Sequence, residues 1–137
     1  MQFTVNALPQ GKARARTATN KYTGKTHSYT PKKTQNYEDL VRWSYKAAGG
    51  EYLGEVPIKL YILAIYQIPT SWSKKKKQQA INGEILPCVK PDGDNCAKAV
   101  MDALNGVCWL DDKQVVDLHI EKIYGTAPRL EITVLPM

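Results

Sequence analysis

The chain has 137 residues, of which 43% are hydrophobic and 23% are charged, with a formal net charge of +6. This length and balance fit one globular domain and exclude an acidic disordered protein, a collagen-like repeat and a disulfide-rich miniprotein. No apolar run reaches the roughly 20 residues of a membrane span, and no secretory signal pattern is found. With three cysteines that form no C-x-x-C pair, the sequence predicts a cytoplasmic protein with free thiols.

The charge is unevenly distributed along the chain. The first 37 residues hold seven basic residues and no acid, whereas residues 90–137 hold five basic and eight acidic residues. This separation predicts a polyanion-binding arm in a protein that also carries a carboxylate site. A solvated basic loop without a partner stays open as the alternative.

In the first half of the chain, alternating apolar residues predict a strand over residues 2–8. The segment from about residue 9 to residue 34 has no periodicity and is expected to be a long basic loop. Apolar residues spaced three and four apart predict a helix over residues 36–48. A nearly continuous apolar run predicts a central strand over residues 56–67, covered on both faces.

The next elements are shorter. Ser71 or Ser73 could cap a helix that runs to about Ile81. Residues 86–90 are expected to form a short apolar strand that leads into a second long helix over residues 94–104, whose buried stripe is again spaced at three and four.

Two alternating segments end the chain, over residues 114–124 and 129–135. They are predicted to be strands joined as a hairpin by residues 125–128. The order of all these elements predicts a single α+β (α/β mixed) domain, with a mixed sheet flanked by two or three helices.

Two aspartates stand where the short apolar segment gives way to the second long helix. Asp92 and Asp94 flank Gly93, so in an extended backbone their carboxylates project to the same side. Asp94 also stands at the helix start, where its oxygen could cap backbone N–H groups, and Lys98 follows one turn later.

Asp111 and Asp112 come just before the strand predicted to begin near residue 114. If that strand pairs beside residues 86–90, these acids converge on Asp92 and Asp94. Clustered carboxylates repel one another unless a cation neutralises them, and oxygen-only donor sets suit Mg²⁺ or Mn²⁺. In basic surroundings such a site favours phosphodiester chemistry. The alternative that these acids are only cap, turn and loop residues stays open at this point.

The acidic segment reads K-P-D-G-D-N, then a lysine four residues after the second aspartate, then D-A-L-N-G and W-L-D-D-K-Q-V, followed later by K-I-Y-G. Near the N-terminus the chain reads G-K-A-R-A-R and Y-T-P-K-K-T. This combination resembles the RusA family of Holliday junction resolvases over most of the chain. The acidic motifs carry the resemblance, and the two N-terminal segments look like that family's basic entry segment.

By that resemblance, Asp92, Asp94 and Asp112 match the family's three metal-binding catalytic aspartates, and Lys98 matches its essential lysine. Asp111 is then a helper or a structural acid. The resemblance implies a Mg²⁺-dependent endodeoxyribonuclease, with Mn²⁺ as a substitute, that acts as a homodimer on four-way DNA junctions by paired symmetric nicks. It also implies a role in DNA recombination and repair, and small resolvases of this kind often look phage-derived.

Basic side chains are expected to neutralise DNA phosphates around the site. They are Lys12, Arg14, Arg16, Lys25, Lys32, Lys33, Lys74, Lys75, Lys76 and Lys77. For the four-lysine run a solvated helix end is the alternative, and Tyr22 and Tyr29 are either exposed loop residues or stacking partners for opened bases. Two other functions stay open: a DNA-binding protein without activity, and a less selective branched-DNA or flap nuclease.

Overall fold

The protein is described by a computed structural model that covers residues 1–12, 16–29 and 31–137. It is an α+β domain with a four-stranded mixed sheet in the order β1-β6-β4-β5 and a separate two-stranded sheet β2-β3, which confirms the predicted fold class. The strands are β1 (Gln2–Val5), β2 (Arg16–Thr19), β3 (Thr26–Tyr29), β4 (Ile58–Gln67), β5 (Val115–Gly125) and β6 (Arg129–Pro136). The helices are α1 (Lys32–Ala47), α2 (Lys74–Ile81), α3 (Gly93–Leu104) and the short 3₁₀ turn η1 (Asp112–Gln114).

Most helix positions agree with the sequence pattern. The Ser73 hydroxyl accepts a hydrogen bond from the Lys76 backbone N–H at 3.2 Å, so Ser73 is the cap of α2. Helix α1 begins at Lys32, four residues before the predicted start, because its polar first turn carries no apolar signal. No helix within the described ranges is both long and apolar enough to cross a bilayer.

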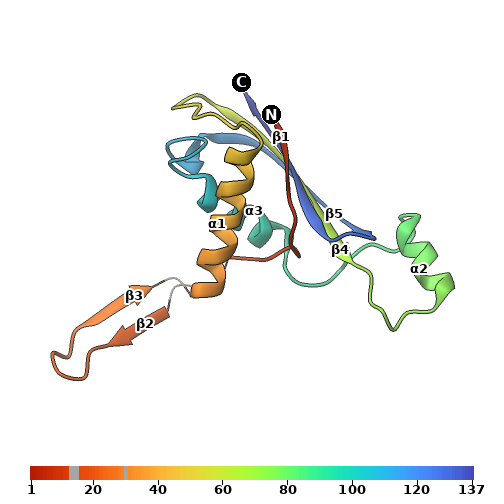
Figure 1. Cartoon of the computed structure of the whole chain (residues 1–137), viewed down its shortest axis with the longest axis horizontal. Coiled ribbons are helices and arrows are strands. Elements are labelled where there is room, and N and C mark those ends of the chain that lie inside the picture. Colours follow the sequence, from red (N-terminus) through yellow and green to blue (C-terminus); the bar gives the residue numbers. More distant parts are fainter. Residues whose placement is uncertain (13–15, 30) are drawn as a thin grey trace.

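The main sheet has one covered face and one open face. Helices α1 and α3 lie on the same side of it, whereas α2 lies beyond one end of β4 and β5 (Figure 1). Alternate side chains of β4 are buried on the covered side: Ile58, Leu60, Ile62, Ala64 and Tyr66. On the other side Tyr61 is 36% exposed, so the predicted covering of both faces is wrong.

The order of the last two strands also differs from the prediction. Strand β4 lies between β5 and β6, parallel to β5 and antiparallel to β6, so β5 and β6 do not form a hairpin. The residues 126–128 that link them instead pass the end of β4, and a Cβ on Gly125, the last residue of β5, would lie 2.6 Å from Cγ2 of Ile65. Alternation reports which face of a strand is buried but not which strand lies beside it, and for this reason the sequence pattern failed here.

Residues 86–90, expected to be a strand, have no strand structure. The Lys122 ammonium on β5 donates a hydrogen bond to the Val89 carbonyl at 2.7 Å, which holds this segment beside the sheet without backbone pairing. Strand β5 pairs with β4 instead, so the predicted pairing of β5 beside residues 86–90 is wrong.

The segment predicted to be a basic loop contains the β2-β3 hairpin. Its turn is held by Asn20, whose side-chain oxygen accepts a hydrogen bond from the Tyr22 N–H at 2.8 Å, and by Gly24, which has a φ of 70°. The hairpin extends away from the rest of the molecule (Figure 1). Because neither of its faces is buried, its sequence lacks the apolar alternation by which strands are recognised.

The close approach of Gly125 to Ile65 gives a stability prediction. Gly125→Ala places a methyl group against the stiff side chain of Ile65, and we expect this overpacking to lower the free energy of unfolding by about 1–3 kcal/mol. Gly93→Ala is the matched control, because its Cβ would meet Ile120 at an ordinary 3.6 Å. Urea denaturation of both variants measures the difference, and equal stability of the two would contradict this close approach.

Candidate active site at the amino end of α3

Helix α3 has a buried side of small and apolar residues and a polar stripe. Its buried residues are Cys96, Ala97, Ala99, Val100, Ala103 and Leu104. Asp94, Lys98 and Asp102 recur every four residues and therefore share the polar stripe. The Lys98 ammonium lies 3.7 Å from Oδ2 of Asp102, which brings positive charge beside the acids.

The two aspartates of the D-G-D sequence are free at the start of this helix. Asp92, not Asp94, occupies the N-cap position, and its side chain makes no capping hydrogen bond. Neither carboxylate has a hydrogen-bond or ion-pair partner among the described residues. Two anionic groups near the positive end of the helix dipole are thus available to a ligand.

Asp111 and Asp112 lie before β5, and Asp111 is the cap of η1. Its carboxylate accepts a hydrogen bond from the Lys113 N–H at 3.1 Å. This bond and one from Asp112 lower the pKa of Asp111, whereas the hydrogen bond with Asp111, partial burial and the charge of Asp102 raise the pKa of Asp112. The turn η1, which begins at Asp112, contacts α3, and the charges of Asp102 and Lys98 on that helix act on Asp112.

A cavity of about 540 Å³ opens beside Asp92. It is lined by residues 9–12, 33–34 and 90–92 and by Asn95, so that Lys12, Lys33 and Lys90 stand close to Asp92. Lysine side chains next to a carboxylate without a protein partner suit the binding of a phosphate group, which would approach a cation held by that carboxylate. The cavity connects the amino end of α3 with the start of the basic segment.

The three aspartates of the candidate site match the ligand chemistry of Mg²⁺, the metal implied by the sequence resemblance. Asp92, Asp94 and Asp112 offer only oxygen ligands, which is the chemistry that Mg²⁺ prefers. Within the described ranges, no three His, Cys, Asp or Glu side chains gather in one group that could hold an ion. The residue types therefore fit Mg²⁺. In this structure, however, the Asp112 carboxyl forms its hydrogen bond with Asp111.

Comparison with known proteins identifies the family. The family model described as Endodeoxyribonuclease RusA matches residues 6–135. The chain belongs to the RusA endodeoxyribonuclease family. It is also 35% identical over 136 residues to the uncharacterized protein YqaN of Bacillus subtilis strain 168, covering 98% of this chain and 94% of that protein.

Several residues of the RusA-like motifs hold the structure of the site. The Gln114 side chain accepts hydrogen bonds from the backbone N–H groups of Leu110 and Asp111, both at 2.9 Å. It also donates to the carbonyls of Gly54 at 2.6 Å and Val56 at 3.0 Å. One side chain thus ties the Asp111-Asp112 turn to the segment before β4.

The D-A-L-N-G sequence has a similar structural role. The Asn105 side chain accepts a hydrogen bond from the indole N–H of the fully buried Trp109 at 2.8 Å. Gly106 follows with a φ of 78°, which a residue with a Cβ adopts at a cost. Asn105 and Gly106 thus hold the chain between α3 and η1, whereas Asp102, the first residue of this sequence, belongs to the polar stripe of α3.

The predicted DNA-contact residues fall into separate groups. Lys25 is exposed in the hairpin, Lys32 and Lys33 are exposed in the first turn of α1, and the ammonium of Lys76 lies 4.1 Å from the ring centroid of Trp72. In α2, Lys74, Lys75 and Lys76 are exposed and Lys77 is partly buried. The hairpin and α2 lie at opposite ends of the long axis, with α1 and α3 between them (Figure 1).

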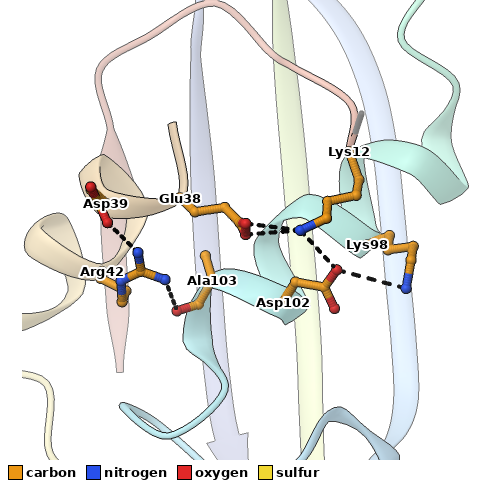
Figure 2. A network of polar contacts seen from close by, with 7 residues as sticks. All are labelled: Lys12, Glu38, Asp39, Arg42, Lys98, Asp102 and Ala103. Carbon is orange, nitrogen blue, oxygen red and sulfur yellow. Dashed lines mark hydrogen bonds and ion pairs between the residues drawn. The ribbon is translucent and has the colours of Figure 1, made fainter. Parts of the chain in front are cut away.

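Two predicted contacts, Arg14 and the side chain of Arg16, fall outside the described residues. Lys12 is described, and it is paired: its ammonium lies 2.9 Å from Glu38 and 3.5 Å from Asp102 (Figure 2). Sequence reasoning missed Glu38 altogether, because it is 26 residues from Lys12 in the chain and no local pattern links them. Asp102 gave one signal, its position four residues after Lys98.

The four hydrogen bonds of Gln114 give a testable prediction. Gln114→Glu keeps the shape of the side chain but turns two donors into acceptors that face the carbonyls of Gly54 and Val56. We expect a loss of about 1–3 kcal/mol in the free energy of unfolding. Gln78→Glu makes the same change at an exposed position on α2 and should stay within about 0.5 kcal/mol of the wild type. Chemical denaturation of the two variants measures both effects.

Proposed function

We propose that this protein is a Mg²⁺-dependent endodeoxyribonuclease that resolves four-way DNA junctions by paired symmetric nicks during recombination and repair. The observation that carries the proposal is the carboxylate of Asp92, without a partner among the described residues, at a cavity lined by lysines in a member of an endodeoxyribonuclease family, with Asp94 following in the first turn of α3. Asp112 and Lys98, which lie near and on the polar stripe of α3, are the other two residues of the proposed active site.

Each residue has a chemical task in this proposal. Asp92, Asp94 and Asp112 would hold Mg²⁺, and Mn²⁺ could replace it. When bound, the ion lowers the pKa of a water and stabilises the charge that develops on the phosphate, so that the cut leaves a 5′-phosphate and a 3′-hydroxyl. Lys98, whose side chain is 59% exposed, is free to place its ammonium against the scissile phosphate. Lys33 and Lys90 would bind flanking phosphates at the cavity.

The exposed hairpin and α2 support DNA as the substrate. The described residues of the hairpin contain no acid, and Tyr22 at its turn is 99% exposed. An exposed aromatic ring among basic side chains is suited to stack on an unpaired base, as a branched DNA offers. The lysines of α2 lie at the opposite end of the molecule and would contact the backbone of another arm.

The three aspartates are tested one at a time. Asp92→Asn, Asp94→Asn and Asp112→Asn should each reduce cleavage of a synthetic four-way junction by at least about a thousandfold, because an amide replaces an anionic ligand. Binding of the junction in a gel-shift assay without Mg²⁺ should be unchanged. Asp39→Asn, an exposed acid on α1, is the control and should cut normally. Full cleavage by any of the three variants would remove that residue from the site.

We further propose that the protein acts as a homodimer. A four-way junction has approximate two-fold symmetry, whereas one chain offers one set of acids, so two copies would supply the two cuts. The open face of the sheet is suited to self-association, because it exposes Tyr61 and Leu135. Several of its charged groups have partners within the face: Lys59 lies 3.8 Å from Asp117, Arg129 lies 3.0 Å from Glu131, and Glu121 accepts a hydrogen bond from the Tyr61 hydroxyl at 2.6 Å.

The dimer is tested by placing a charge on the open face. Tyr61→Lys puts an ammonium where an apolar contact is proposed, and it should yield a monomer in analytical ultracentrifugation and end the pairing of nicks on opposed strands. Tyr52→Lys makes the same change at an exposed loop position and should stay dimeric. A wild-type protein that sediments as a monomer and nicks one strand per binding event would favour a branched-DNA or flap nuclease instead.

A further inference from the structure

Four side chains of alternating charge form a continuous chain beside the site (Figure 2). The Lys12 ammonium lies 2.9 Å from Oε1 of Glu38 and 3.2 Å from its Oε2. The same ammonium lies 3.5 Å from Oδ2 of Asp102, and that oxygen also lies 3.7 Å from the ammonium of Lys98. The chain therefore joins three elements: the segment after β1, helix α1 and helix α3.

Three of these four side chains are largely shielded from solvent, whereas that of Lys98 is not. The side chain of Glu38 is 10% exposed and those of Lys12 and Asp102 are each 21% exposed, whereas that of Lys98 is 59% exposed. Burial lowers the pKa of Lys12, but the hydrogen bond and charge of Glu38, together with Asp102, outweigh it, and the net shift is upward. Lys12 thus stays charged and engaged by carboxylates, which leaves it poorly placed to bind a DNA phosphate.

The backbone at Lys12 is held against α3 as well. Its N–H donates a hydrogen bond to the Asn95 carbonyl at 3.3 Å. The neighbouring Gly11 approaches so closely that a Cβ there would lie 2.6 Å from the side-chain nitrogen of Asn95. This contact is in the first turn of α3, next to Asp94, so the start of the basic segment is held beside the acids.

Oδ2 of Asp102 pairs with the ammonium groups of both Lys12 and Lys98, so a change at Lys12 alters how strongly Asp102 attracts Lys98. With Lys12 present, the attraction of Asp102 for Lys98 is divided, so the catalytic ammonium is oriented but not sequestered. Without Lys12, Asp102 would pair with Lys98 alone and draw it away from the phosphate. Without Asp102, the flexible four-carbon stem of Lys98 would lose its orientation.

We infer that Lys12 and Asp102 are positioning residues for Lys98, and that Glu38 holds Lys12 in place, so that the first lysine of the basic segment acts on the cleavage rate rather than on DNA affinity. The inference rests on the proposed function through the role of Lys98. It separates Lys12 from the other lysines of the arm, which are exposed and suited to bind phosphates.

The test separates rate from affinity on a synthetic four-way junction. Lys12→Met, Glu38→Gln and Asp102→Asn should each lower the single-turnover rate at saturating junction by about tenfold, with the dissociation constant without Mg²⁺ changed less than about twofold. Lys12→Arg restores a cation at the same place and should recover most of the rate. Lys32→Met, at an exposed position of α1, is the control and should weaken binding without lowering the saturated rate.

Two further measurements test whether Lys12 and Asp102 act through Lys98. The rate loss of the double variant Lys12→Met with Asp102→Asn should be smaller than the product of the single losses, because both act through Lys98. Labelling of Lys98 by an amine reagent, followed by mass spectrometry without DNA, should be slower in Lys12→Met and faster in Asp102→Asn than in the wild type. Thermal unfolding of each variant confirms that it is folded before its rate is interpreted.

A failure of this inference can be told apart from a failure of the proposed function. Weaker binding with a normal saturated rate in Lys12→Met would make Lys12 a phosphate contact and overturn the inference. Unchanged labelling of Lys98 in both variants would also overturn it, whatever the enzyme does. A wild-type protein that binds the junction but never cuts it with Mg²⁺ would defeat the proposed function, while the labelling result would still decide whether the charge chain controls Lys98.

Discussion

The packing of α3 against both α1 and the sheet is the constraint on which the site depends. Alanines at positions 97, 99 and 103 are buried, and their small side chains let the helix lie close to its neighbours. Since most of its circumference is covered, only a narrow stripe is left for polar groups, and that stripe carries Asp94, Lys98 and Asp102. Hydrophobic burial thus determines where the charged side chains of the site stand.

The electrostatics of the site follow from this crowding. The pKa of Asp112 is raised first by its hydrogen bond with Asp111, then by partial burial and by the negative charge of Asp102 on α3. Lys98 and Lys12 neutralise part of this charge from the two sides of Asp102. Of the two acids without a partner among the described residues, Asp92 lines the cavity and Asp94 follows it in the first turn of α3.

The surfaces away from the site divide into two kinds. The hairpin and α2 are strongly basic, extend to opposite ends of the molecule and pack little of their surface against it. The open face of the sheet instead holds two ion pairs, Lys59–Asp117 and Arg129–Glu131, and exposes aromatic and aliphatic groups. A polyanion is attracted to the first kind and not to the second, so DNA and a second copy of the chain would use different surfaces.

The sequence by itself determined the elements whose signal is local. The apolar stripes of α1 and α3, the serine cap of α2 and the alternation of β5 and β6 are all signals within a few residues of chain, and each of these elements is present, whereas the strand expected over residues 86–90 is not. The acidic motifs also identified the family before any geometry was known, because their spacing along one helix and one turn is itself local information.

Only the tertiary structure decided which elements lie side by side. The insertion of β4 between β5 and β6, the β2-β3 hairpin and the ion pair of Lys12 with Glu38 left no periodic signal in the sequence. Alternation records that a face is buried, but the same pattern is compatible with several partners for that face. A charge pair between distant residues is fixed only when packing of the apolar core brings their two elements together, and the core of this protein does so at α1 and α3.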